Sequence, residues 1–319
     1  MSTHTVGIWM YQNGGGDAIQ RKLVERLKER DIDTITGLDL SKAVARQGSV
    51  YCNGISMEEL DLFYSYNAGE QSPYQVYLYE LLDRLIPTIN NFRSFMLTED
   101  KFKTSHLLQR HGIRTPEYRL CNKYQLDDVK FIIKDWKDGG VYKPTDGWGG
   151  RGIVRIDNEK NLDMLAPFIQ KLEEPHFFIE RFIKNDFSDF RIDVVDNQFV
   201  GCYGRIAPEG QWKTNITSGG SVIQREPNNE VVDTALRAAK ATGLEIAGVD
   251  LVYDQEHEEY VVLEVNGIPA FATPDQERMG LDFNDRKIEK IVDLIERQIT
   301  KNKVYTAPAS LEEYLYAVK

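Results

Sequence analysis

The sequence predicts a mixed α/β fold, of the α+β type in its later part, with a doubly wound α/β domain at the N-terminus. Two observations support this class. A strand (6–10), a glycine turn (13–16) and an amphipathic helix (19–30) open the chain, in the order typical of a doubly wound domain. Further along, apolar strands are separated by glycine turns. The length of 319 residues accommodates two domains, or one large fold in two or three lobes.

The N-terminal domain is expected to include a second strand at 60–64, a polar aromatic loop at 65–74 and a helix at 75–85. The glycine turn differs from the dinucleotide-binding motif because Ile19 occupies the third glycine position. It is therefore either a plain turn or a loop that touches a substrate. Thr98 is expected to cap a helix over 99–111, which Gly112 and Pro116 end.

From Phe131 onward the pattern favours strands. The expected strands are 140–143, 152–156, 177–183, 190–195, 199–205, 247–253 and 260–266, with helices at 231–242 and 287–300.

Composition narrows the class of function. A net charge of -11 argues against nucleic-acid binding, which depends on clustered Lys and Arg. Cys52, Cys121 and Cys202 are far apart, so neither a disulfide framework nor a zinc site is indicated. No apolar run is long enough to span a membrane, and Met1 to Met10 does not have the pattern of a signal peptide. We therefore expect a cytoplasmic protein with no membrane partner.

A glycine-rich segment follows Lys143. Between the expected strands, Gly147, Gly149, Gly150 and Gly152 supply four glycines in six positions. Such a loop brings backbone N–H groups close to phosphate oxygens. It is not a Walker A loop, because no G-K-[ST] follows. Taken alone, it is equally typical of a flexible turn.

Two later strands contain isolated carboxylates. If their hairpin is centred near His257, Asp250 lies opposite Glu264, and Asn266 shares a strand face with Glu264. Two carboxylates and an amide on one apolar face are costly without a cation, and these oxygen ligands suit magnesium. The alternative is an ordinary hairpin whose polar side faces water.

Further polar residues occur on or near the strands in the middle of the chain. They are Glu180, Asp189, Arg191, Arg205 and, before Ser218-Gly219-Gly220, Asn215. Arginine suits bidentate contacts with carboxylate or phosphate. Each residue by itself is typical of a protein surface, so their joint placement ahead of the hairpin is the informative observation.

These motifs together resemble the ATP-grasp superfamily, specifically the RimK-like and glutathione synthetase-like ligases. The resemblance runs from about Thr98 to Ile295. The matching segments are 99–101 with 112–113, 142–144 with the glycine loop, 179–183, 189–191, Arg205, Asn215 with 219–220, 247–250 and 263–266.

The resemblance implies a role for each matching residue. Lys101 and Lys143 look like the lysines that reach the ATP phosphates, and the loop from Gly147 to Gly152 looks like the flap over them. The resemblance further implies that adenine is bound by Glu180, Arg181, Phe182 and Ile183 and that ribose is bound by Asp189. It implies that Lys213 and Asn215 lie near the phosphates, and that the metal is bound by Asp250, Glu264 and Asn266. Arg191 and Arg205 would lie near the transferred phosphoryl group and the substrate carboxylate.

The resemblance also implies a division of the chain. The expected parts are an N-terminal domain (1–97), a central lobe with the flap (98–178), a C-terminal lobe with the metal site (179–300) and a tail (301–319). Two segments differ from the family pattern. Residues 267–271 replace the usual Ser-Ser/Pro-Gly-Phe, and Trp148 lies where smaller residues are common. Both segments lie near the expected position of the acceptor substrate. They therefore affect the expected identity of that substrate and leave the expectation of nucleotide use unchanged.

We therefore expect an ATP-grasp ligase that uses ATP and Mg²⁺, with Mn²⁺ as a substitute. It would form an amide bond through an acyl phosphate, adding a glutamate-like amino acid to a small-molecule or peptide acceptor. A phosphotransferase with the same ATP site is the main alternative, and a nucleotide-binding module without catalysis is a third. The family is also compatible with a homo-oligomer.

Overall fold

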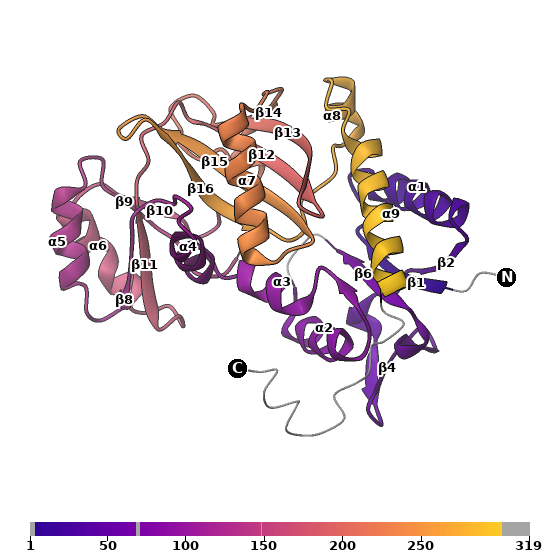
Figure 1. The fold of residues 1–319 in the computed structure, drawn as a ribbon. Coiled ribbons are helices and arrows are strands. Elements are labelled where there is room, and N and C mark those ends of the chain that lie inside the picture. The colour runs from indigo at the N-terminus through magenta and orange to yellow at the C-terminus, as the bar shows by residue number, and fades with distance from the viewer. Residues whose placement is uncertain (1–3, 68–70, 148, 302–319) are drawn as a thin grey trace. The chain divides into compact units, whose positions relative to one another are not determined.

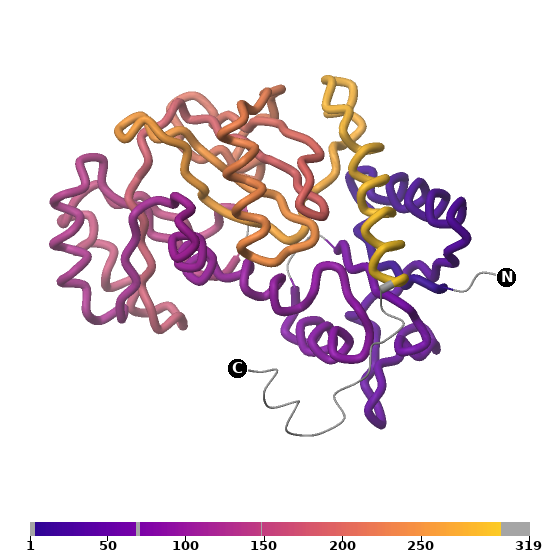
Figure 2. The backbone as a smooth tube through the Cα atoms, in the orientation of Figure 1, coloured from indigo at the N-terminus to yellow at the C-terminus, as the bar shows by residue number. Residues whose placement is uncertain are grey.

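The structure is a computed structural model that describes residues 4–67, 71–147 and 149–301. Within these residues the chain divides into two compact units. Unit 1 comprises the described parts of 1–93, 270–277 and 282–319, and unit 2 comprises those of 94–269 and 278–281. Unit 1 therefore combines both ends of the described chain, as the indigo and yellow segments of Figures 1 and 2 show.

Unit 1 is built on a parallel sheet with the strand order β2-β1-β6-β7. Its main elements are β1 (His4–Met10), α1 (Gly16–Glu29), β2 (Ile32–Thr36), β6 (Leu62–Tyr66), α2 (Pro73–Leu85), β7 (Thr88–Ile89) and α9 (Asn284–Lys301). A small antiparallel sheet is formed by β3 (Val44–Arg46), β4 (Ser49–Cys52) and β5 (Ile55–Ser56). The expected strand–turn–helix opening is confirmed, whereas β2 and the small sheet were not predicted.

The last helix of the described chain, α9, belongs to unit 1, although it was expected in the C-terminal lobe (179–300). Four isoleucines form a buried stripe on this helix, Ile288, Ile291, Ile295 and Ile299, and the helix packs against α1 (Figure 1). Arg30, just after α1, forms ion pairs with Asp293 at 2.8 Å and Glu296 at 2.6 Å. The tail that was expected over 301–319 lies outside the described residues, apart from Lys301 at the end of α9.

In unit 2, one sheet has the order β10-β9-β11-β8. Its strands are β8 (Tyr118–Asn122), β9 (Gly140–Tyr142), β10 (Val154–Ile156) and β11 (His176–Arg181), and the helices beside it are α5 (Asp127–Asp135) and α6 (Glu159–Ile169). The expectation of strands from Phe131 was wrong at its start, because Phe131 lies in α5. Val129 and Ile133, four residues apart, are buried there at helical spacing. The expected lobe boundary at 178/179 falls inside β11.

The other sheet of unit 2 is antiparallel, with the order β14-β13-β12-β15-β16. Its strands are β12 (Ser188–Val195), β13 (Gln198–Ile206), β14 (Ser221–Ile223), β15 (Ile246–Asp254) and β16 (Glu259–Asn266). Helices α4 (Lys101–Arg110) and α7 (Asn229–Thr242) pack against this sheet (Figure 1). Leu108 and Ala235 belong to the core between these helices and the sheet. The short helices α3 (Phe92–Thr98) and α8 (Pro274–Arg278) complete the fold.

The N-terminal cap of α4 is Asp100, so the prediction of Thr98 as the cap was wrong. Asp100 accepts a hydrogen bond from the backbone N–H of Lys103 at 2.9 Å. Thr98 is the last residue of α3, and its hydroxyl donates to the carbonyl of Phe95 at 2.9 Å. A short helix therefore precedes the one that was predicted.

Over residues 4–67, 71–147 and 149–301, no helix has both the length and the apolar character that a membrane crossing requires.

Candidate functional site

A pocket in unit 2 is lined by residues from both of its sheets. It contains most of the residues that the sequence analysis selected. The selected residues that line it are Lys101, Lys143, Glu180, Arg181, Phe182, Ile183, Asp189, Arg205, Lys213, Asn215, Asp250 and Glu264. Arg191 contacts the pocket residue Asp250, while the loop glycines and Asn266 are absent from the lining.

Charged residues lie opposite one another across the strands beside this pocket. Asp189 on β12 is the register partner of Arg205 on β13, and Arg191 on β12 is the partner of Asp250 on β15. Asp250 in turn faces Glu264 on β16, which confirms the predicted pairing, although the register shifts between Asp250 and Leu251 on the way to the turn. The strands thus place these residues in two adjacent rows across the sheet, one with Arg205 and Asp189 and the other with Arg191, Asp250 and Glu264.

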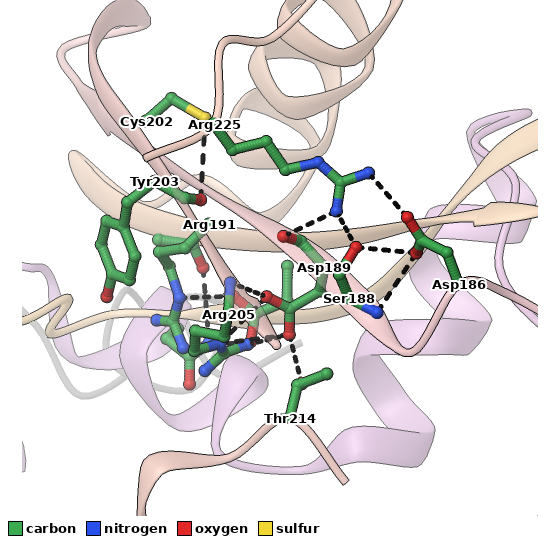
Figure 3. Close-up of polar contacts among 12 residues, drawn as sticks. Asp186, Ser188, Asp189, Arg191, Cys202, Tyr203, Arg205, Thr214 and Arg225 are labelled. Carbon is green, nitrogen blue, oxygen red and sulfur yellow. Dashed lines mark hydrogen bonds and ion pairs between the residues drawn. The ribbon is translucent and has the colours of Figure 1, made fainter. Parts of the chain in front are cut away.

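The side chains of Asp189, Arg191, Arg205 and Asp250 form a connected network (Figure 3). The Nη2 atom of Arg205 lies 2.7 Å from Oδ2 of Asp189 and 2.8 Å from Oδ2 of Asp250. Arg191 reaches the same Asp250 oxygen through Nη2 at 3.0 Å and also pairs with its other oxygen. Asp250 therefore joins both arginines.

Burial dominates the electrostatics of this network. It raises the pKa of Asp250 to about 6, although the charges of Arg191 and Arg205 oppose the increase. Burial also acts to raise the pKa of Glu264, but the positive charge of Lys101, followed by that of Arg191, helps to bring it below its ordinary value. Facing carboxylates of this kind are costly unless cations balance them.

The chemistry of the predicted metal ligands fits a hard divalent cation. Asp250 and Glu264 are adjacent across the hairpin, and Asn266 pairs with Gly248 one step along the same strands. The amide of Asn266 donates to the carbonyl of Gly248 at 3.4 Å. Within the described residues, no group of three or more His, Cys, Asp and Glu side chains gathers as a metal site, so this candidate set relies on two carboxylates and one amide.

Of the three predicted lysines in the pocket lining, Lys101 and Lys143 are paired with carboxylates. Lys143, which follows β9, pairs with Glu180 on β11, and Glu180 also accepts a hydrogen bond from Ser105 on α4 at 3.3 Å. The ammonium of Lys101 lies 3.5 Å from Oε1 of Glu264 and donates to the carbonyl of Gly147. Carboxylates of the protein therefore pair with both of these lysines, and an anionic ligand would have to compete with those carboxylates.

The glycine loop is fastened to the segment after β13. Gly147, Gly149, Gly150 and Gly152 all have positive φ values, between 69° and 91°, a conformation that favours glycine. Lys213 donates to the carbonyls of Ile153 at 2.7 Å and Gly150 at 3.4 Å, and Thr217 donates to that of Gly149 at 2.5 Å. A Cβ on Gly150 would lie 2.9 Å from Oδ1 of Asn215. Trp148 lies outside the described residues.

The segment expected to read adenine already uses two of its backbone donors. The N–H of Arg181 donates to Glu117 at 2.7 Å, and that of Phe182 donates to Gly139 at 3.0 Å. The guanidinium of Arg181 pairs with Asp254 and lies 3.1 Å from Glu256. The side chains of Phe182 and Ile183 remain as an apolar part of the pocket wall.

Several pocket residues were not predicted. Val141 and Val252 lie two residues from Lys143 and Asp250, respectively. Because side chains two residues apart on a strand point to the same face, these valines could have been predicted from the alternation. Trp212 and Thr214 flank Lys213 directly, and a hydroxyl beside a predicted binding residue was a further clue. Ser105 is outside the pocket lining but supports Glu180, and it was not predictable from sequence because only the packing of α4 brings it there.

Comparison with known proteins identifies the family. The model of the RimK-like ATP-grasp domain matches residues 98–291, more than half of the chain. The chain belongs to the RimK-like ATP-grasp family. This confirms the resemblance and the fold class that were inferred from the motifs.

Among its relatives, the tetrahydromethanopterin:alpha-L-glutamate ligase of Methanocaldococcus jannaschii is 31% identical over 75% of this chain and 81% of its own length. The alpha-aminoadipate–LysW ligase LysX of Saccharolobus solfataricus is 29% identical over 58% of this chain and 67% of its own length. The structure of the ATP-grasp ligase PsnB with a minimal precursor matches with a TM-score of 0.67 and 17% identity, covering 93% of this chain and 100% of that one. At that identity the PsnB match supports the ATP-grasp fold alone.

Proposed function

We propose that this ATP-grasp protein is an ADP-forming ligase that adds L-glutamate, or an amino acid like it, to the carboxylate of an acceptor. The observation that supports this most directly is the pocket of unit 2, where three lysines meet Arg205 and the facing carboxylates Asp250 and Glu264 within an ATP-grasp fold. A ligase relative that is named for alpha-L-glutamate supports the choice of amino acid. The acceptor is a small molecule or a peptide.

The nucleotide is proposed to lie along the wall between the two sheets of unit 2. Phe182 and Ile183 offer an apolar surface to the base, and Lys101 and Lys143 face the phosphates. The glycine loop is proposed to cover the phosphates, with Lys213 fastening it to the other sheet. Such a cover would exclude water from a reactive acyl phosphate.

Asp250, Glu264 and Asn266 are proposed to hold Mg²⁺, for which Mn²⁺ would substitute. When bound there, the ion reduces the negative charge of the phosphates during transfer. The protein contributes the fixed positions of these oxygens, which the hairpin register sets.

Arg191, Arg205 and Asn215 are proposed to act at the reacting groups. Both guanidiniums are held by Asp250 at the edge of the pocket. A carboxylate that attacks ATP gains a phosphoryl group, and an arginine stabilises the charge that spreads over its oxygens. The amine then attacks the acyl carbon and phosphate leaves, so that an amide forms and ATP yields ADP and phosphate.

Replacing Lys143 with Ala is expected to weaken Mg–ATP binding about ten- to a hundredfold, the effect of losing a charged hydrogen bond. Titration calorimetry with Mg–ATP measures this directly. Lys134→Ala is the matched control, because Lys134 is exposed on α5 and pairs with Glu159 at 3.0 Å. Equal ATP affinity in the two variants would remove Lys143 from the phosphate site.

The function is tested by incubating the protein with ATP, Mg²⁺, L-glutamate and a panel of carboxylate acceptors, with products read by mass spectrometry. ADP release that needs both the acceptor and glutamate, with a product equal to their sum less water, is the expected result. A phosphorylated product that forms without any amine would identify a phosphotransferase instead. ATP binding with no ADP release across the panel would favour a non-catalytic module.

A further inference from the structure

Helices α5 and α6 of unit 2 lie side by side and run in opposite directions (Figure 1). Lys130 on α5 lies 2.6 Å from Asp163 on α6, and Lys134, one turn later, lies 3.0 Å from Glu159, one turn earlier. On each helix the residue before the first of these contacts is buried and the residue after it is exposed. Because the helices are antiparallel, the residues that follow the two contact positions point to the same outer surface.

The exposed stripe of α5 is apolar in the middle and acidic at both ends. Phe131 is 66% exposed, and Asp127 and Asp135 lie four residues away on either side of it. Residues four apart on a helix are neighbours on one face. Among the described residues, neither aspartate has an ion-pair partner.

The exposed stripe of α6 has the opposite charge. Lys160, Met164 and Phe168 follow one another at the same spacing, and Lys171 comes three residues later. Met164 is 71% exposed and Phe168 is 69% exposed. Over the described ranges of the chain, neither of these lysines forms an ion pair. The two stripes therefore combine exposed apolar side chains with charges of opposite sign.

The charges at one end of the stripes do not stabilise the helices that carry them. Asp135 is the last residue of α5, and Lys160 is the second residue of α6. A helix dipole favours a cation at the C-terminus and an anion at the N-terminus, so each of these charges has the unfavourable sign. The stability of the separate helices therefore gives no reason for either charge.

The exposed apolar area is large enough for a stable interface. Tyr124, 65% exposed, and Leu172, 47% exposed, extend the two stripes, and the hydroxyl of Tyr124 donates to the carbonyl of Gln170 at 3.4 Å. We call the combined surface the α5–α6 face, which consists of Tyr124, Asp127, Phe131, Asp135, Lys160, Met164, Phe168, Lys171 and Leu172. At about 200 Å² for each large side chain, its five apolar residues expose about 600 Å². Two such faces would bury about 1,200 Å², the lower end of the range for stable complexes.

The α5–α6 face is complementary to a second copy of itself. A two-fold axis parallel to the helices sets α5 of one copy against α6 of the other, so that the acidic and basic stripes meet. The salt bridges between α5 and α6 fix which residues lie at the same level along the helix axes. Since such an axis preserves this level, it brings Asp135 to Lys160 of the partner subunit and Phe131 to Met164 of the partner subunit. A uniformly acidic or basic partner would match one stripe only.

We propose that the α5–α6 face is the surface through which two copies of this chain form a two-fold symmetric dimer. Its residues are distinct from those that line the pocket of unit 2, so the inference does not depend on the proposed function. Loss of the dimer and loss of nucleotide binding are therefore separable in experiments.

Sedimentation velocity of the full chain, over a wide range of protein concentrations and without nucleotide, measures its mass and its dimerisation constant. We expect twice the 36.7 kDa of one chain. Phe131→Ala should raise the dimer Kd at least about a hundredfold, since truncating a buried anchor costs about tenfold or more and the symmetric interface contains it twice. Met279→Ala is the matched control, because Met279 is 51% exposed in the same unit, and it should leave the Kd unchanged.

A charge exchange tests the two-fold arrangement itself. Asp135→Lys and Lys160→Asp should each raise the dimer Kd at least about tenfold, because each places like charges opposite one another. The double variant restores opposite charges, so its Kd should return to within about threefold of the wild-type value. Each new charge has the sign that the helix dipole favours, so the monomers should stay folded, which circular dichroism checks.

Three results would overturn the proposal. A wild-type chain that stays monomeric at every concentration would leave the α5–α6 face to a different protein. A dimer that Phe131→Ala does not weaken would have its interface elsewhere on the chain. Losses that multiply in the double charge variant would show that Asp135 does not face Lys160 of the partner subunit.

Discussion

Glu264→Gln is expected to reduce ADP release at least about a hundredfold, on the scale at which even the outer partners of a metal site affect activity. Glu264 faces Asp250 across the hairpin, and its carboxylate lies 3.5 Å from the ammonium of Lys101. The amide of glutamine keeps the size of the side chain but removes the charge that a divalent cation requires. The Mg²⁺ concentration needed for half-maximal activity should rise with the loss of rate.

The measurement is ADP release as a function of Mg²⁺ concentration. Glu259→Gln is the matched control, because Glu259 begins the same strand and pairs with Arg114 at 2.8 Å, away from the pocket. Circular dichroism establishes that both variants are folded. Wild-type rates and an unchanged Mg²⁺ requirement in Glu264→Gln would refute the metal assignment.

Arg205→Ala is expected to destabilise the protein by about 3–5 kcal/mol, because it removes one partner from a buried charge network. Arg205 is 7% exposed and pairs with Asp189 and Asp250, which are 1% and 3% exposed. Asp189 would lose the two side-chain donors of Arg205, Nε and Nη2, at once, and Asp250 would keep Arg191 alone. Leaving a buried carboxylate without its partner costs much more free energy than breaking a surface pair.

Thermal and urea unfolding give the change in stability. Arg237→Ala is a suitable control in the same unit, because Arg237 is half exposed on α7 and its ion pair with Asp233 spans 3.8 Å. A loss of about 1 kcal/mol or less is expected for that variant. A similarly small loss for Arg205→Ala would show that the network contributes little to folding.

The hairpin of the candidate site was predictable because its pattern is local. The apolar alternation on both sides of the polar turn predicted the two strands, and the structure pairs Asp250 with Glu264 as expected. The pairing also depends on a register shift between Asp250 and Leu251, which the sequence did not reveal. The family resemblance likewise depended on short, ordered segments, and the match over residues 98–291 confirms that resemblance. The N-terminal cap was misplaced for the opposite reason, since Thr98 and Asp100 are both suitable caps and only the packing of α3 distinguishes them.

Charge, alternation and motif order in the sequence alone therefore determined the fold class, the family and most of the residues that line the pocket. The tertiary structure decided the pairing of those residues. Only the strand order β13-β12-β15-β16 places Asp189 against Arg205, and Arg191 against Asp250. It also assigned α9 to unit 1, because the helix buries its isoleucine stripe there and packs against α1. The free energy of burial and the strand register select partners that are separated by tens or hundreds of residues. A local sequence pattern determines neither of them.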